Sequence, residues 1–99
     1  MRPGPLRISS LSREYIYAWV GGVIGNEPVD VAIVRTSEPD EGDWVAATWA
    51  NVTPAGADAR ILVGPGGDVT LTDGMWHMWV RVTATPEVPV LYSGPILVT

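Results

Sequence analysis

His77 is the only histidine in the chain, so any chemistry that needs an imidazole depends on it. Catalysis by histidine also needs a nucleophile or a carboxylate that the fold places beside the ring. Ser93 and Asp73 are residues of suitable type, but the sequence contains no nucleophile-elbow motif. We therefore expect His77 to be an exposed or interfacial residue, and we expect a non-enzymatic protein with no catalytic residue and no cofactor.

Four carboxylates lie close together in the segment 37–43, and oxygen-rich loops of this kind bind calcium in other proteins. Their spacing differs from the Asp-x-Asp-x-Asp-Gly pattern of a calcium loop, and Pro39 stiffens the segment. We therefore predict a solvated acidic loop and no metal site. The four residues are Glu38, Asp40, Glu41 and Asp43.

The glycine-rich segment Gly64-Pro65-Gly66-Gly67 has the flexibility of a phosphate-binding loop. Such a loop ends in Lys-Ser/Thr and opens a helix, because the lysine and the helix N-terminus hold the phosphates. Neither feature follows Gly67. The segment is therefore predicted to be a tight turn between strands.

Three of the five tryptophans, Trp44, Trp49 and Trp79, are candidates for a binding surface. Aromatic rings on a sheet can stack against sugars, and they are equally enriched, with arginine, in protein interfaces. Trp44 and Trp49 are also candidates for the core, because a chain without Phe must take its core aromatics from Trp and Tyr. The candidate contact residues on this surface are His77, Trp79, Arg81, Trp44 and Trp49.

Composition excludes several classes of partner. The 99-residue chain has a net charge of −5 and only six basic residues, which are scattered, so we expect binding neither to nucleic acid nor to an anionic membrane. It has no cysteine, and no apolar run approaches the roughly 20 residues that span a bilayer. The first five residues do not resemble a secretion signal.

The clearest structural pattern is the two-residue alternation after Asp73-Gly74. Trp76, Met78, Val80 and Val82 share one face of residues 75–83, and His77, Trp79, Arg81 and Thr83 share the other. This pattern predicts a strand with a buried face containing Trp76 and an outward face containing Trp79. Residues 92–98 are expected to form the last strand and to pair with it, with Pro95 marking an edge or a bulge.

Other strands are predicted at 6–11, 14–20, 29–35, 59–63 and 69–71, whereas 44–50 could be an edge strand or a helical turn. Residues 51–58 are expected to form a loop. About seven strands, separated by turn signals every eight to twelve residues, predict an all-β fold and a single β-sandwich over residues 6–99. Residues 1–5 are expected to form an extended arm whose Pro3 and Pro5 contact a neighbour.

The segment Gly74-Met75-Trp76-His77-Met78 resembles the Gly-x-Tyr-x-Cys motif that begins strand F of immunoglobulin-like domains. Trp76 takes the place of the tyrosine and Met78 that of the cysteine. The resemblance implies an immunoglobulin-like sandwich, although Trp76 has no hydroxyl for the tyrosine-corner hydrogen bond. It implies nothing about function.

A wider resemblance links the chain to small virion proteins of tailed phages that infect actinobacteria. The matching segments are Ile61-Leu62-Val63-Gly64-Pro65-Gly66-Gly67, residues 76–83, 86–90 and 93–98, and residues 11–17 near the N-terminus. The resemblance implies a structural component of the virion, as a capsid decoration or minor capsid protein or as a head–tail connector. Its partners would be major capsid or connector subunits and further copies of itself. The alternative from the tryptophans is a carbohydrate-binding module on the virion surface.

Overall fold

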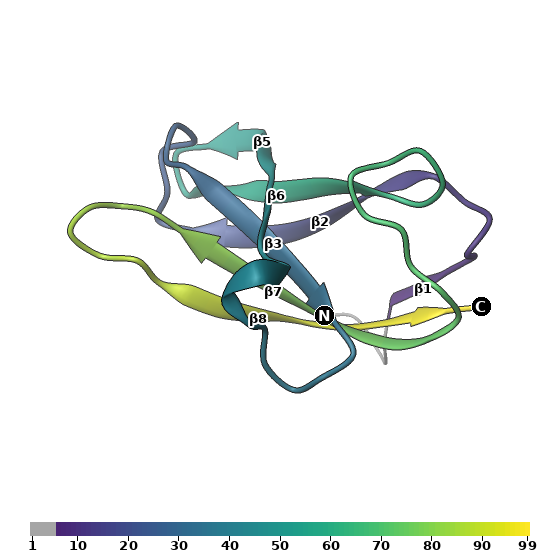
Figure 1. Cartoon of the computed structure of the whole chain (residues 1–99). Helices are drawn as coiled ribbons and strands as arrows, with labels where there is room; N and C mark the ends of the chain where they lie inside the picture. The colour runs from purple at the N-terminus through teal and green to yellow at the C-terminus, as the bar shows by residue number, and fades with distance from the viewer. Residues whose placement is uncertain (1–5) are drawn as a thin grey trace.

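The computed structural model describes residues 6–99, in which eight strands form two sheets packed face to face (Figure 1). The larger sheet has the order β1-β8-β7-β3-β4, and the smaller has the order β2-β6-β5. The predicted all-β fold and single β-sandwich are confirmed. The elements are β1 (Leu6–Ile8), β2 (Glu14–Gly21), β3 (Val29–Val34), the short 3-10 turn η1 (Glu41–Asp43), β4 (Val45–Ala46), β5 (Thr48–Thr53), β6 (Gly56–Val63), β7 (Gly74–Val82) and β8 (Val90–Val98).

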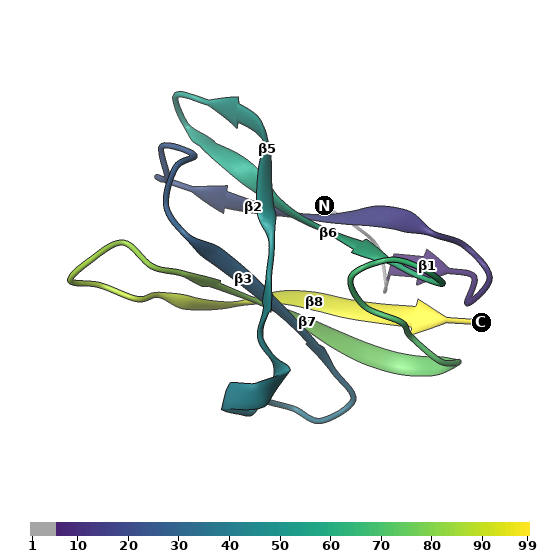
Figure 2. The same ribbon diagram turned by 45° about the horizontal axis from the view of Figure 1, so that its top comes forward.

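Figure 2 shows β5 and β6 on one side of the sandwich and β7 and β8 on the other. The core lies between the two sheets and is built mainly from aliphatic side chains. Burying one valine or isoleucine side chain stabilises the fold by about 1.5–3 kcal/mol, so a few such residues dominate the stability. Trp49 and Trp76 are only partly buried and pack against the margin of the core. The largest fully buried side chains are Ile61, Ile96, Val31, Val63, Val80, Val82 and Val98.

β7 positions the candidate surface because it lies between β3 and β8 in the larger sheet. Met78, Val80 and Val82 point into the core, and the alternating residues between them point outward, as the sequence predicts. The predicted pairing of β7 with the last strand is confirmed. Met78 pairs with Gly94 and Trp79 pairs with Tyr92, so Ser93 has no partner and β8 has a bulge at this residue. The bulge agrees with the prediction that Pro95 marks an edge or a bulge.

Two predictions of local structure are wrong. Residues 51–58 are not a loop, because β5 continues to Thr53 and β6 begins at Gly56. The Thr53 hydroxyl closes this hairpin by accepting hydrogen bonds from the N–H groups of Ala55 and Gly56, at 3.2 Å each. The expected strand at 69–71 is reduced to an isolated bridge between Val63 and Val69.

The segment 44–50, which the sequence left open, forms β4 and the first part of β5. β1 runs parallel to the end of β8, with Leu6 opposite Ile96. The predicted arm with Pro3 and Pro5 lies outside the described residues. Across the described part of the chain, no helix has the length and apolar character needed to cross a membrane.

Candidate functional site

Three outward residues of β7, together with Tyr92 of β8 and Trp44, form a continuous surface that we call the Trp79 face. Trp79 lies between Ala32 of β3 and Tyr92 in the ladder. The rings of Trp79 and Tyr92 are 5.1 Å apart and tilted by 55°. The Tyr92 hydroxyl lies 2.9 Å from His77 Nδ1, so these rings are held in one cluster. The three β7 residues are His77, Trp79 and Arg81.

Two hollows flank Trp79 on this face. One, of about 380 Å³, is lined by Ser37, His77, Trp79 and Tyr92. The other, of about 310 Å³, lies between Trp79 and the segment around η1, and its lining includes Trp44 and Arg81. The indole N–H of Trp79 is buried and has no hydrogen-bond acceptor. A partner can therefore contact the apolar ring of Trp79 but cannot accept a hydrogen bond from its indole N–H.

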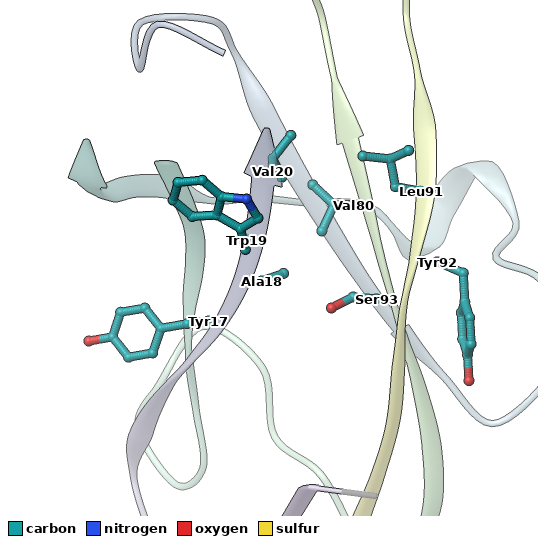
Figure 3. A pocket seen from close by; sticks show the side chains of 8 residues that line it. All are labelled: Tyr17, Ala18, Trp19, Val20, Val80, Leu91, Tyr92 and Ser93. Atoms are coloured by element: carbon teal, nitrogen blue, oxygen red, sulfur yellow. The ribbon is translucent and has the colours of Figure 1, made fainter. Parts of the chain in front are cut away.

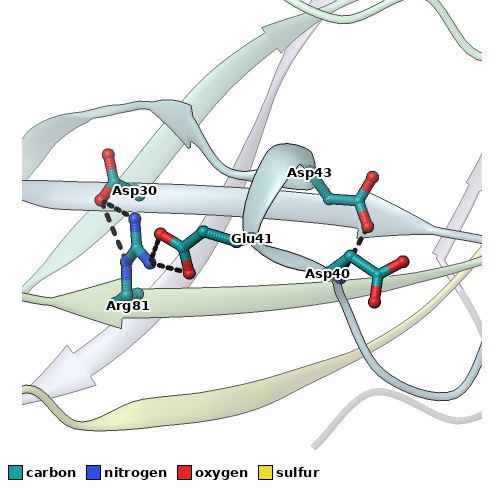
Figure 4. A network of polar contacts seen from close by, with 5 residues as sticks. All are labelled: Asp30, Asp40, Glu41, Asp43 and Arg81. Atoms are coloured by element: carbon teal, nitrogen blue, oxygen red, sulfur yellow. Dashed lines mark hydrogen bonds and ion pairs between the residues drawn. The ribbon is translucent and has the colours of Figure 1, made fainter.

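Arg81 is fixed by two carboxylates (Figure 4) and by the aromatic ring of Trp44. Its Nε and Nη2 donate to Oδ2 of Asp30 at 3.2 and 3.0 Å, and its Nη1 donates to Oε1 of Glu41 at 3.1 Å. Its guanidinium lies 4.6 Å from the ring centroid of Trp44. Burial alone would lower the pKa of Arg81, but the bonds to Asp30 and Glu41 outweigh it and raise that pKa. The face thus has a permanent cation whose charge is already balanced.

The side chain of Asp43 caps the turn η1 within the acidic segment 37–43. The backbone N–H of Asp40 donates to Oδ2 of Asp43 at 2.8 Å, and Glu41 turns away to Arg81 (Figure 4). In the described range 6–99, no group of three or more acidic, histidine or cysteine side chains is arranged to hold a metal ion.

His77, Ser93 and Asp73 are not brought together as a catalytic group. The side chain of His77 is hydrogen-bonded to Tyr92. Ser93 lines a separate groove beside β2. Asp73 lies in the turn before β7, where its carbonyl oxygen accepts a hydrogen bond from Arg35 at 3.0 Å. The surface therefore has the features of a binding site, with aromatic rings and a fixed arginine.

Trp49 lies apart from the Trp79 face. It is on β5 in the other sheet, opposite Ala59, and it packs against the core. Its indole N–H donates to the carbonyl oxygen of Glu27 at 2.7 Å. Of the candidate contact residues in the described range, the structure thus brings together His77, Trp79, Arg81 and Trp44, and separates Trp49 from them.

Sequence reasoning missed Tyr92, which lines the larger of the two hollows. Simple alternation from Ile96 and Val98, both buried, would turn Tyr92 inward. The bulge at Ser93 shifts the alternation by one residue and turns Tyr92 outward, where 49 % of it is exposed. The run Ser93-Gly94-Pro95 could have indicated this bulge from the sequence, because glycine and proline inside a strand mark bulges.

No protein-family model matches this sequence, and no curated protein or solved structure is significantly similar to it.

Proposed function

We propose that this protein is a non-enzymatic structural domain that binds another protein subunit through the Trp79 face. The observation that carries the proposal is the open hollow of about 380 Å³ that His77, Trp79 and Tyr92 line with their rings. Hot spots in protein interfaces are buried aromatic and arginine side chains that fit such concave surfaces. Arg81 adds a fixed guanidinium beside the aromatic rings without bringing an unpaired charge into the interface.

The strand order supports an immunoglobulin-like topology as part of this proposal. β8, β7, β3 and β4 follow the order of strands G, F, C and C′ in such domains, and β2, β6 and β5 follow the order B, E and D. Immunoglobulin-like sandwiches have many functions, so the topology supports a scaffold and not a particular partner.

The resemblance of residues 61–67 and 76–83 to small phage virion proteins supplies the class of partner. We therefore propose that the protein resides in a virion and contacts major capsid or connector subunits. On a symmetric particle many copies bind at once, so a contact that is weak in isolation becomes firm through avidity. The net charge of −5 suits a component that does not hold the genome.

A carbohydrate-binding site on the same face has less support. It would need the indole of Trp79 to be coplanar with that of Trp44 or Trp49. Trp49 is turned toward the core, and the Arg81 guanidinium lies against the ring of Trp44. The remaining neighbour, Tyr92, is tilted by 55° to Trp79. The geometry of the face favours contact with an irregular protein surface.

The test combines particle composition with binding. Mass spectrometry of purified virions should detect the chain at a fixed ratio to the major capsid protein, and absence from the particle would refute the virion assignment. Trp79→Ala and His77→Ala should each weaken binding to purified capsid or connector subunits by about tenfold or more. The matched control is Leu11→Ala, which removes an 87 % exposed apolar side chain outside the face and should change nothing.

Circular dichroism establishes that the variants are folded. Undiminished binding by both folded variants would refute the assignment of the Trp79 face. Binding of the wild-type chain to a glycan array, lost in Trp79→Ala, would instead establish the carbohydrate-binding function.

A further inference from the structure

β2 has one long edge that is open to pairing. It ends the smaller sheet and pairs with β6 along all of its eight residues. Within the part of the chain that the structure describes, no strand pairs with its opposite edge.

The ladder with β6 determines which backbone groups are free. The N–H of Gly22 donates to the carbonyl oxygen of Ala55, its register partner, at 2.8 Å. Hydrogen-bonded and non-hydrogen-bonded pairs alternate in an antiparallel ladder, so the even-numbered residues of β2 direct their backbone groups to β6. Tyr15, Tyr17 and Trp19 therefore present their N–H and C=O groups at the free edge.

This edge lacks the features that usually prevent pairing with another chain. Exposed edge strands are commonly blunted by lysine, proline, a bulge or very short length. β2 contains no lysine or proline, its register with β6 is unbroken, and its only charged residue is Glu14 at its first position. The edge strands β1, β4 and β5 are less suited to pairing, because β1 has three residues, β4 has two, and the register of β5 is broken between Ala50 and Thr53.

A groove of about 280 Å³ with both polar and apolar lining runs beside the free edge, between β2 and β8 (Figure 3). Ala18, Val80 and Leu91 line its apolar wall. Trp19 at its rim is 55 % exposed and Leu91 is 41 % exposed. In Figure 3, Tyr17 and Tyr92 point outward from the two borders of the groove. Apolar surface adjoining unpaired backbone groups is typical of a contact site and not of a solvated surface.

We propose that β2 pairs in antiparallel orientation with β2 of a second copy of this chain, joining two three-stranded sheets into one sheet of six strands. The row of free donors and acceptors requires an extended backbone as its occupant. β2 is complementary to itself because a two-fold axis at Tyr17 places Glu14 opposite the uncharged Val20 of the second copy. No like charges meet, and the aromatic side chains at 15, 17 and 19 face one another across the seam.

The free edge of β2 contains no residue of the Trp79 face, although Tyr92 borders both that face and the groove. The proposal holds whether or not the partner of the Trp79 face is a virion subunit. Tyr17→Pro removes a backbone N–H that points to the free edge, so it spares the ladder with β6 while blocking the new one. Tyr17→Thr is the matched control, because it also removes the ring but keeps the N–H and suits a strand. Trp19→Pro and Trp19→Thr form a second pair in case Tyr17→Pro fails to fold.

Sedimentation velocity from about 1 μM to about 1 mM should detect a monomer–dimer equilibrium for the wild-type chain. A folded proline variant should raise the dimer dissociation constant by about tenfold or more relative to its threonine control. Amide exchange at Tyr15, Tyr17 and Trp19 should slow as the concentration rises. His77→Ala should dimerise like the wild-type chain.

Three results would overturn the proposal. One is a monomer at every concentration, and another is a dimer that persists in both proline variants. The third is slow exchange of the Tyr17 amide in the monomer, since it would mean that another segment of the same chain covers the edge.

Discussion

Arg81 on β7 and Asp30 on β3 lie directly opposite each other in the ladder, and both Nε and Nη2 of Arg81 donate to a single oxygen of Asp30. Their side chains are 22 % and 28 % exposed, whereas that of Glu41, the second partner of Arg81, is 87 % exposed. The two ion pairs therefore differ in how strongly water screens them. Arg81 ties the middle of the larger sheet to η1 and to Trp44.

The first prediction is a ranking of stabilities. Arg81→Ala should lower the free energy of unfolding by about 1–2 kcal/mol, because it removes charge-assisted hydrogen bonds and uncovers Trp44. Asp30→Asn should lower the free energy of unfolding more than Glu41→Gln does. The loss in Glu41→Gln should stay within about 0.5 kcal/mol, because an exposed ion pair contributes little. Urea unfolding measures all three. Equal losses of unfolding free energy in Asp30→Asn and Glu41→Gln would contradict the ranking.

The second prediction concerns Glu27, whose carboxylate closes the loop before β3. Oε1 accepts from the N–H groups of Gly25 and Asn26 at 3.0 and 3.2 Å, and Oε2 accepts from that of Ile24 at 3.1 Å. Burial would raise its pKa, but its backbone hydrogen bonds outweigh that effect and lower the pKa from 4.5. The carboxylate therefore stabilises the fold fully above pH 4.5, and this stabilisation is lost as the pH falls through the lower pKa of the folded state.

Glu27→Gln should accordingly be less stable than the wild-type chain at neutral pH, and the difference should shrink below about pH 4.5. Unfolding free energies across this pH range provide the measurement. Glu87→Gln is the control for the loss of one surface carboxylate, because Glu87 is exposed. A Glu27→Gln curve parallel to that of the wild-type chain at all pH values would show that the loop does not depend on the charge.

Sequence reasoning succeeded where one local pattern determines the result. The alternation in β7 predicts the outward positions of His77, Trp79 and Arg81 because the strand is regular through those residues. It could not place Trp49, whose orientation depends on a hydrogen bond to Glu27, 22 residues away. Alternation alone does not show which face of β2 is buried, because both faces carry apolar residues and only the packing against the second sheet decides.

The aromatic residues of the core show the same limit. Tryptophan and tyrosine were expected to supply the aromatic residues of the core, yet valine and isoleucine fill the core and Trp76 lies at its margin. Trp76 is held there by its N–H, which donates to the carbonyl oxygen of Thr72 at 2.8 Å, and by Arg35, 4.3 Å above its ring. The N–H of a tryptophan is usually hydrogen-bonded when it leaves water, which favours positions near loop carbonyl groups such as that of Thr72.

The third prediction concerns Gly64, which begins the glycine-rich turn after β6. Its φ of +111° lies outside the range that other residues adopt readily. A Cβ at this position would overlap the carbonyl oxygen of Ser12 and come within 2.8 Å of the Cα of Arg13. The N–H of Gly67 donates to the Gly64 carbonyl oxygen at 2.9 Å, so the run forms the predicted turn. The glycine is required by the close approach of two backbone segments.

Gly64→Ala should therefore lower the free energy of unfolding by about 3 kcal/mol or more, because backbone atoms cannot move aside as a flexible side chain would. Gly42→Ala is the matched control, since a Cβ there meets nothing within 4 Å and the change should stay within about 0.5 kcal/mol. Chemical denaturation of the two variants beside the wild-type chain makes the comparison. If Gly64→Ala lost no more stability than Gly42→Ala, the segment around Ser12 would have to shift freely, and the turn would not be fixed by that contact.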